Sequence, residues 1–295
     1  MNLRSTELER TERQMILVTG ATGTVGREVV AQLLQAGQRV RALTRDPSKA
    51  QFDERVEVTR GDLSKPETLT KAVQGVESVF SLALGPGLGE QEANLARTAK
   101  TAGVRHIVKL SVLGAATEPR SRVALWHAAG ERAIQESGIP WTFVRPGAFM
   151  SNTLFWRDSI RSQGKVFSNY GDGKLPPVDP RDIAAVAVLA LTTDGHEGKA
   201  YSITGPEALS VGEQVAILSD ILGKQIEYVP ITDETAREGM EKSGMPAYLI
   251  DALLPFAAYI RSGKAAEVLP TVEEITGKRP STFAHWARVH AEAFA

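Results

Sequence analysis

The chain has 295 residues, of which 42% are hydrophobic and 23% are charged, so it can bury the core of one large α/β domain or of two smaller ones. A formal net charge of −1 provides no basic surface for nucleic acid or anionic membrane, and we expect neither as a partner. The chain contains no cysteine, which excludes disulfides, thiolate nucleophiles, iron–sulfur clusters and zinc–thiolate sites.

The first 14 residues are rich in charge and lack an apolar segment. We therefore expect residues 1–14 to form a flexible extension and not a secretory signal. No apolar run approaches the roughly 18 residues of a membrane span, so a cytoplasmic protein is expected.

The apolar run from Met15 to Val18 predicts a buried strand, and three glycines follow it at a spacing of three. Valines and leucines then recur at helical spacing. In such a strand–turn–helix, the glycines permit a tight turn, close approach of backbone N–H groups to a pyrophosphate, and close packing of the helix. The helix N-terminus adds partial positive charge. The pattern predicts a dinucleotide site that includes Gly20, Thr22, Gly23, Thr24, Val25 and Gly26.

The second predicted strand, residues 39–45, indicates which dinucleotide binds. Its last residue is Arg45, at the position where an acidic side chain holds the ribose of NAD. A guanidinium suits a 2′-phosphate, with Thr44 and Lys49 as additional contacts. We expect NADP(H), while Asp46 leaves use of NAD(H) open.

Strands and helices continue to alternate up to residue 146. Strands are predicted at 55–59, 78–84, 106–112 and 141–145, and helices at 64–73, 90–102 and 124–137. The helix at 64–73 is inferred from a capping box formed by Ser64 and Glu67. This alternation predicts a doubly wound, mostly parallel Rossmann sheet, in which ligands bind beyond the carboxyl ends of the strands.

The regular alternation of strands and helices ends after Pro146. Asp179 predicts the start of a helix, residues 200–204 a last strand, and Ser210 with Glu213 a second capping box on a helix that Gly223 ends. A short strand is predicted at 227–231, and an apolar helix at 248–259 that Pro255 interrupts. We expect an NADP-binding core at 15–150, and a region at 151–295 that completes the sheet over about 179–205 and forms a smaller α/β substrate lobe.

Five motifs stand out along the chain: GATGTVG (20–26), VRALTRDPSKA (40–50), GDL (61–63), HIVKLSVLGA (106–115) and SGIPWTFVRPGAFM (137–150). Together they resemble the NmrA-like atypical short-chain dehydrogenases. That family includes NADPH-dependent reductases of quinones, azo dyes and triphenylmethane dyes, reductases of natural-product pathways, and cofactor-sensing regulators. The resemblance implies that Asp62 and Leu63 contact the adenine. It also implies that Ala83 and Leu84 contact the nicotinamide ribose, and that Pro146 and Phe149 contact the nicotinamide.

The chain departs from most short-chain dehydrogenases in lacking their Tyr-xxx-Lys pair. It has no tyrosine before Tyr170, and the corresponding positions hold Val123 and His127. Ser111 matches the serine that polarises a carbonyl in relatives. His127, whose ordinary pKa is about 6.5, is expected near the nicotinamide ribose or as the acid that protonates a product. Ser111 and His127 are therefore the candidate catalytic residues. The alternative interpretation is that Ser111 is only a hydroxyl at the end of a strand and that His127 is only a histidine on the surface of a helix.

Without a strong proton donor, hydride transfer suits acceptors that stabilise their own negative charge. We predict an NADPH-dependent reductase of planar conjugated acceptors such as quinones and azo dyes. Two alternatives remain open, an NADP(H)-sensing regulator with little turnover and a carbonyl or enone reductase of a natural-product pathway. No histidine spacing indicates a metal site, and both a monomer and a homodimer are compatible with the sequence.

Overall fold

The computed structural model describes residues 14–115 and 121–295, so nearly all of the predicted N-terminal extension lies outside the described residues. The chain divides into two compact units. The first comprises Met1–Ser111, Trp126–Arg145 and Ala184–Tyr201, and the second Val112–Leu125, Pro146–Ile183 and Ser202–Ala295. Within the described ranges, no helix is long and apolar enough to cross a membrane.

A seven-stranded sheet has the order β3-β2-β1-β4-β5-β6-β9. Its neighbours from β3 through β6 pair in parallel. The direction of the strand order reverses between β1 and β4, which is the point where doubly wound sheets bind ligands. This arrangement confirms the predicted Rossmann fold. The strands are β1 (Met15–Val18), β2 (Arg39–Thr44), β3 (Val56–Arg60), β4 (Ser78–Ser81), β5 (His106–Leu110), β6 (Trp141–Pro146) and β9 (Lys199–Ile203).

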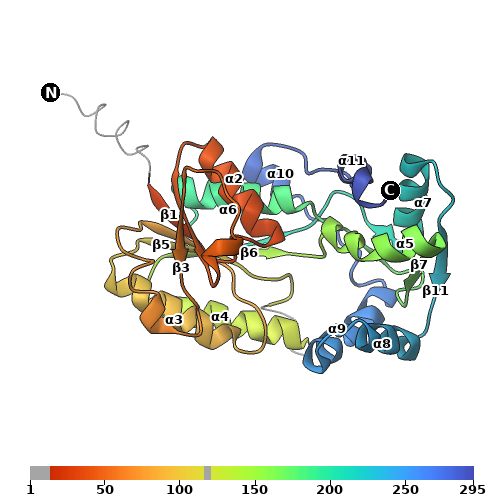
Figure 1. Ribbon diagram of the computed structural model, residues 1–295, viewed down its shortest axis with the longest axis horizontal. Coiled ribbons are helices and arrows are strands. Elements are labelled where there is room, and N and C mark those ends of the chain that lie inside the picture. Colours follow the sequence, from red (N-terminus) through yellow and green to blue (C-terminus); the bar gives the residue numbers. More distant parts are fainter. Residues whose placement is uncertain (1–13, 116–120) are drawn as a thin grey trace. The chain divides into compact units, whose positions relative to one another are not determined.

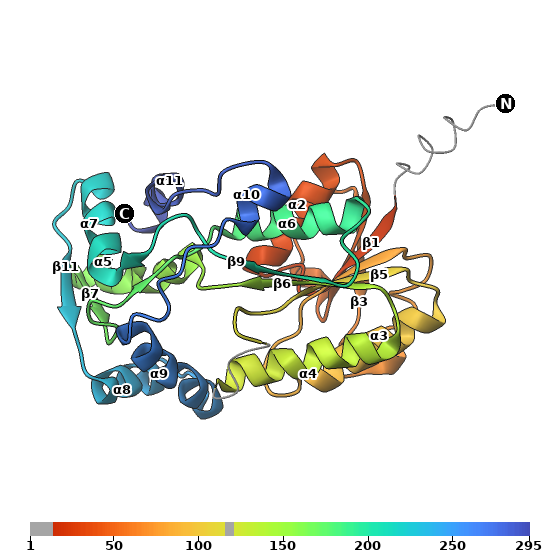
Figure 2. The same ribbon diagram turned by 180° about the vertical axis from the view of Figure 1, so that it is seen from behind.

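Helices cover both faces of this sheet (Figures 1 and 2). Helices α2 (Thr24–Gln35) and α6 (Pro180–Thr192) lie on one face, and α3 (Leu88–Thr101) and α4 (Arg122–Ser137) lie on the other. Central parallel strands buried on both faces are expected to be apolar throughout, and every residue of β1 and β4 is indeed buried. The side chains of the α3/α4 face form a continuous apolar core with Leu17, Val79, Leu95, Ile107, Ile134 and Phe143 among its members.

The predicted helix at 64–73 is wrong. The structure has only a short 3₁₀ turn, η3 (Pro66–Thr68), in this segment. The Asp62 carboxylate accepts the N–H of Ser64, and the Thr68 hydroxyl donates to the carbonyl of Lys65. These local side-chain bonds satisfy backbone groups that a helix would otherwise pair, so they compete with it.

Several other boundaries differ from the prediction by a few residues, two of them near the candidate site. Helix α3 begins at Leu88, so Gly89 lies inside the helix instead of in the preceding loop. Strand β4 ends at Ser81, where Leu82 turns away to bond with the end of β1.

The second unit contains two small sheets and several helices. Strand β8 (Lys174–Leu175) pairs antiparallel with β10 (Leu209–Ser210), and β7 (Lys165–Ser168) pairs parallel with β11 (Glu227–Pro230). An apolar cluster that includes Met150, Val215, Phe283 and Trp286 forms its core. The helices are α5 (Arg157–Gln163), α7 (Val211–Leu222), α8 (Asp233–Lys242), α9 (Ala247–Arg261), α10 (Thr271–Thr276) and α11 (Phe283–Val289), and 3₁₀ turns lie at η4 (Met150–Trp156) and η5 (Ala291–Ala293). A further 3₁₀ turn, η2 (Pro47–Lys49), belongs to the first unit.

The helix-end signals in this half of the chain act as predicted. The Asp179 carboxylate accepts the N–H of Arg181 at the start of α6, Ser210 and Glu213 form a complete capping box on α7, and Gly223 ends α7 in a left-handed conformation. Pro255 does not interrupt α9, which runs through it. Burial of Ile250, Ala257 and Ile260 along one face holds the helix together despite the lost hydrogen bond.

The glycine motif folds as its spacing predicts. Gly20 has a φ of +60°, and its carbonyl accepts the N–H of Gly23 at 2.9 Å. A Cβ atom on Gly26 would lie 2.1 Å from the Gly20 oxygen. The turn and the close packing of α2 on β1 therefore require these glycines.

We expect Gly26→Ala to lower the free energy of unfolding by about 3 kcal/mol or more, because the methyl group meets rigid backbone. Gly239→Ala is the matched control. Gly239 lies on the exposed side of α8, where a Cβ atom would have no neighbour within 4 Å, and alanine there should add about 0.5–1 kcal/mol. Urea denaturation of both variants measures the difference. Equal stability of the two would contradict the packing argument.

Candidate functional site

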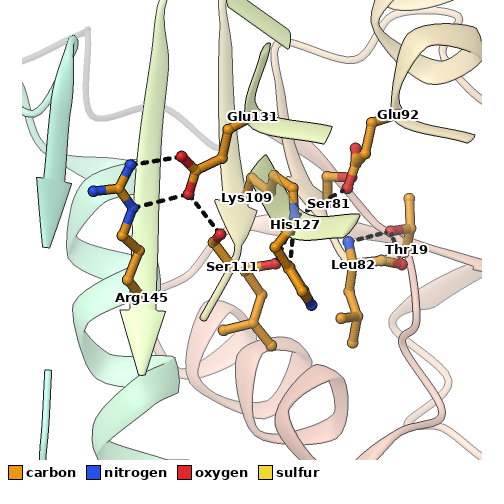
Figure 3. A network of polar contacts seen from close by, with 10 residues as sticks. Thr19, Ser81, Leu82, Glu92, Lys109, Ser111, His127, Glu131 and Arg145 are labelled. Atoms are coloured by element: carbon orange, nitrogen blue, oxygen red, sulfur yellow. Dashed lines mark hydrogen bonds and ion pairs between the residues drawn. The ribbon is translucent and has the colours of Figure 1, made fainter. Parts of the chain in front are cut away.

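Thr19 joins the carboxyl ends of β1 and β4. Its backbone N–H donates to the carbonyl of Phe80 at 2.9 Å, and its hydroxyl accepts the N–H of Leu82 at 2.7 Å while donating to the Leu82 carbonyl at 3.1 Å. Leu82 in turn packs against Gly20. Figure 3 shows the paired bonds between Thr19 and Leu82. These contacts fix the base of the glycine loop at the switch point of the sheet.

The glycine loop presents the predicted residues in two ways. Thr22, Gly23 and Thr24 are exposed, whereas Val25 and Gly26 are buried beneath α2. Thr22 and Thr24 therefore offer backbone N–H groups at the start of a 12-residue helix, which is where phosphates bind, whereas the N–H of Gly23 already donates to the Gly20 carbonyl. The buried pair supports the loop from below.

Arg27 was missed by the sequence analysis. Its Nε donates to the carbonyl of Thr22 at 3.0 Å and its Nη1 to that of Gln51 at 3.4 Å, while the guanidinium lies 5.8 Å from the centre of the Phe52 ring. Arg27 thus connects the glycine loop to the segment between β2 and β3. Its position directly after the third glycine was the available signal.

Arg45 lies exposed at the end of β2, and no hydrogen bond or ion pair engages it within the described ranges. The neighbouring Asp46 is occupied: its carboxylate accepts bonds from the N–H and hydroxyl of Ser48 and lies 3.3 Å from the Lys49 ammonium. The Ser48 and Lys49 contacts lower the pKa of Asp46. The basic residue at this strand end is therefore the available one, and the acidic residue is not.

The remaining predicted cofactor residues lie at several places. Thr44 accepts the N–H of Asp46 through its hydroxyl, and Leu63 packs against the core while its carbonyl accepts a bond from Asn94. Ala83 is buried and Leu84 is 71% exposed. Asp62 is half-buried in the first unit, whereas Pro146 and Phe149 belong to the second.

Ser111 belongs to a cluster with Glu131 and Arg145. Its hydroxyl donates to Glu131 Oε1 at 2.5 Å, and Arg145 donates to both oxygens of Glu131 at 2.9 and 2.5 Å (Figure 3). Ser111 and Glu131 are both buried. Because the serine proton is directed at a carboxylate, it is not free to polarise an acceptor carbonyl in this arrangement.

A second buried cluster surrounds Lys109, in the middle of β5. Lys109 and Glu92 of α3 have no exposed side-chain surface, and the ammonium lies 3.6 Å from Glu92 Oε1. Lys109 Nζ also donates to the carbonyl of Leu110 at 2.9 Å and to His127 Nδ1 at 3.2 Å. Glu92 Oε2 accepts the hydroxyl of Ser81 at 2.5 Å. The sequence analysis missed this cluster and assigned Lys109 only to a strand.

The charged pair has space because residue 130 is a glycine. A Cβ atom there would lie 2.9 Å from Lys109 Cε and 3.0 Å from Glu92 Cγ, and only 2.3 Å from Leu88 Cδ2. A lysine inside the apolar strand HIVKL and a glycine in the middle of a predicted helix were the two sequence signals.

His127 does not lie on the surface of α4, so the plainer reading of the sequence is wrong. The residue is 6% exposed, and burial together with the nearby Lys109 charge lowers its pKa to about 3. The imidazole is therefore neutral near pH 7 and is not an imidazolium acid there. An ammonium has no lone pair, so Nδ1 accepts from Lys109 and the ring N–H lies on Nε2.

Comparisons with known proteins show the family of the chain. A family model described as NAD(P)H-binding matches residues 20–194. The chain is 44% identical to an NAD(P)H azoreductase of Xenophilus azovorans over 283 residues, covering 95% of the chain and 99% of the relative. It is 45% identical to a (4-alkanoyl-5-oxo-2,5-dihydrofuran-3-yl)methyl phosphate reductase of Streptomyces griseus over 284 residues, with the same coverage.

Solved structures give the same result. An NADPH-dependent quinone oxidoreductase of Escherichia coli in complex with NADPH matches with a TM-score of 0.82 and 30% identity, over 92% of this chain and 98% of that one. A Citrobacter sp. triphenylmethane reductase in complex with NADP(H) matches with a TM-score of 0.82 and 30% identity, over 94% and 99%. These findings confirm the reductase family that the motifs indicated.

The depressed pKa of His127 makes stability depend on pH. Below the ordinary value of about 6.5 the unfolded chain binds a proton at this residue that the folded protein does not bind until about pH 3. The free energy of unfolding should therefore fall on acidification through that window, by up to about 1.4 kcal/mol per pH unit from this group. Denaturation of the protein and of His127→Asn between pH 7 and 5 tests this. A variant with an unchanged pH slope would contradict it.

Proposed function

The chain belongs to the NAD(P)H-binding family of oxidoreductases, and on that premise we propose that it is an NADPH-dependent reductase of planar conjugated acceptors, such as azo dyes and quinones. Two observations together carry the proposal. Arg45 is free at the end of β2, and the positions of the Tyr-xxx-Lys pair hold Val123 and His127 while the Ser111 hydroxyl is bonded to Glu131.

The residues present fit NADP(H). The exposed glycine loop and the start of α2 would hold the pyrophosphate, and Arg45 would hold the 2′-phosphate, since the guanidinium is free and Asp46 is engaged by Ser48. Asp62 and Leu63 would border the adenine, and Ala83 and Leu84 the nicotinamide ribose. The bound cofactor supplies a hydride.

The acceptor class follows from what the site lacks. A simple ketone forms an alkoxide on reduction and needs an adjacent acid, which the Tyr-xxx-Lys pair ordinarily supplies. Here Ser111 donates to Glu131, and the neutral imidazole of His127 is too weak an acid to polarise a simple carbonyl as that pair does. Acceptors that spread negative charge over a conjugated system are the ones such a site can serve.

A second candidate is reduction of an enone, and the Streptomyces griseus relative favours it because its substrate contains a carbon–carbon double bond conjugated to a carbonyl group. An enone also delocalises the charge that hydride addition creates. The two candidates differ in the acceptor, and both use the same cofactor residues.

Purified protein should oxidise NADPH in the presence of an azo dye, a quinone or a cyclic enone, at a rate at least about tenfold above that with NADH. Absorbance of the reduced cofactor measures the reaction. The acceptor with the highest kcat/KM decides between the two candidates. Tight binding of NADPH with no turnover on any acceptor would contradict the proposed function and favour a cofactor-sensing protein.

Arg45→Ala should raise the Kd for NADPH by about 10- to 100-fold, since it removes charge-assisted bonds to the 2′-phosphate. The Kd for NADH should stay within about twofold. Arg55→Ala is the control for loss of an exposed arginine, because Arg55 lies just before the start of β3, away from the carboxyl end of β2, and is paired with Asp53 at 2.8 Å. Titration calorimetry measures both constants. An equal loss of affinity for NADPH and NADH would show that Arg45 does not bind the 2′-phosphate.

A further inference from the structure

We propose that the buried ammonium of Lys109 is the proton source that completes reduction of the acceptor, and that the imidazole ring of His127 carries this proton to the surface. The inference rests on the proposed reductase function and assigns to it a proton path. It replaces the imidazolium acid that the sequence suggested with a neutral relay.

The first support is the geometry around the ammonium. The ammonium hydrogen-bonds to two acceptors, the carbonyl of Leu110 at 2.9 Å and His127 Nδ1 at 3.2 Å, and it forms an ion pair with Glu92 Oε1 at the longer distance of 3.6 Å. Glu92 is oriented by the bond from Ser81 to its other oxygen. Figure 3 shows the path from Ser81 and Glu92 through Lys109 to His127.

The second support is the outer nitrogen of His127. Nε2 makes no hydrogen bond within the part of the chain that the structure describes. It is also absent from the fully buried atoms without a partner, of which Glu92 Oε1 is the single example among the described residues. Nε2 is therefore without a hydrogen-bond partner among the described residues, and it points away from Lys109 (Figure 3).

The third support is energetic, because a buried charged cluster with only a structural role would add little to the stability of the fold. A buried ion pair seldom stabilises a fold more than apolar residues of the same volume. Its space also requires a glycine inside α4, where alanine would stabilise the helix. Burial lowers the pKa of Lys109, which makes the ammonium a stronger acid, while Glu92 and Glu131 oppose this effect.

Atoms and charges balance in the proton-transfer step. Reduction of an azo group adds one hydride, which NADPH supplies, and leaves a nitrogen anion that must gain one proton. The N–H bond of His127 Nε2 breaks as the product N–H bond forms, and Nδ1 takes a proton from the Lys109 ammonium at the same time. The ring stays neutral, and lysine is left as the free amine beside Glu92. After product release, a proton from water at Nε2 returns the relay to its starting state.

Two variants test the path. Lys109→Met combined with Glu92→Gln removes both buried charges together, so no unpaired charge remains to unfold the protein. His127→Gln keeps a polar side chain but cannot relay a proton. Lys71→Met, at an exposed lysine, is the control for the change of residue type.

The first measurement needs no turnover. In ¹⁵N NMR spectra of the protein without cofactor, His127 should be a neutral imidazole with its proton on Nε2 at pH 5–7. In the Lys109→Met/Glu92→Gln protein its two tautomers should mix, and its titration should move up in pH. A wild-type His127 that titrates near pH 6.5, or that carries its proton on Nδ1, would overturn the proposal.

The second measurement compares two acceptors. An azo dye needs a hydride and a proton, whereas a cationic triphenylmethane dye becomes neutral with a hydride alone. Both variants should lower kcat with the azo dye by about 100-fold and change it with the cationic dye by less than about threefold. Equal losses on both dyes, or no loss on either, would overturn the proton path. A wild-type protein inactive on every acceptor would instead refute the proposed function, and the NMR result would still decide the relay.

Discussion

The burial of the Lys109 ammonium against the Glu92 carboxylate is the constraint on which the candidate site depends. Removing two charges from water costs several kcal/mol for each ion, and the attraction between them offsets this only when every remaining donor and acceptor is placed well. This requirement accounts for the neighbouring residues: Ser81 bonds to the carboxylate, His127 accepts from the ammonium, and Gly130 leaves room for both side chains. Loss of one partner would leave an uncompensated charge in the α3/α4 face of the sheet.

The same arrangement occurs twice along the carboxyl ends of neighbouring strands. Ser81, the last residue of β4, donates to Glu92 of α3, and Ser111, just after β5, donates to Glu131 of α4, each at 2.5 Å. In both places a cationic side chain forms an ion pair with the carboxylate: Lys109 pairs with Glu92, and Arg145 pairs with Glu131. The two serines therefore hold glutamates, and the proposed proton path leaves the chemistry to the Nε2 of His127.

The sequence predicted those features that depend on a few adjacent residues. The glycine turn, the capping box of α7 and the end of β2 at Arg45 each follow from local backbone and side-chain chemistry. The helix at 64–73 failed because Thr68 and Asp62 make competing bonds that a capping pattern does not reveal. Lys109 was missed since its partners come from two helices distant in sequence. His127 was found by its spacing to Gly138, but its burial and tautomer depend on Lys109, which spacing does not show.

The proposed separation of hydride and proton would allow a site without tyrosine to serve chemically different acceptors. A tyrosine that polarises a carbonyl must meet one oxygen at a set position, which restricts the acceptor to that shape. A neutral imidazole whose inner nitrogen is held by Lys109 offers a single N–H and makes no demand for an oxygen. It can protonate nitrogen, carbon or oxygen after the hydride arrives. Relatives that reduce azo compounds, a conjugated furanone and quinones are consistent with a family whose proton donor does not select the acceptor atom.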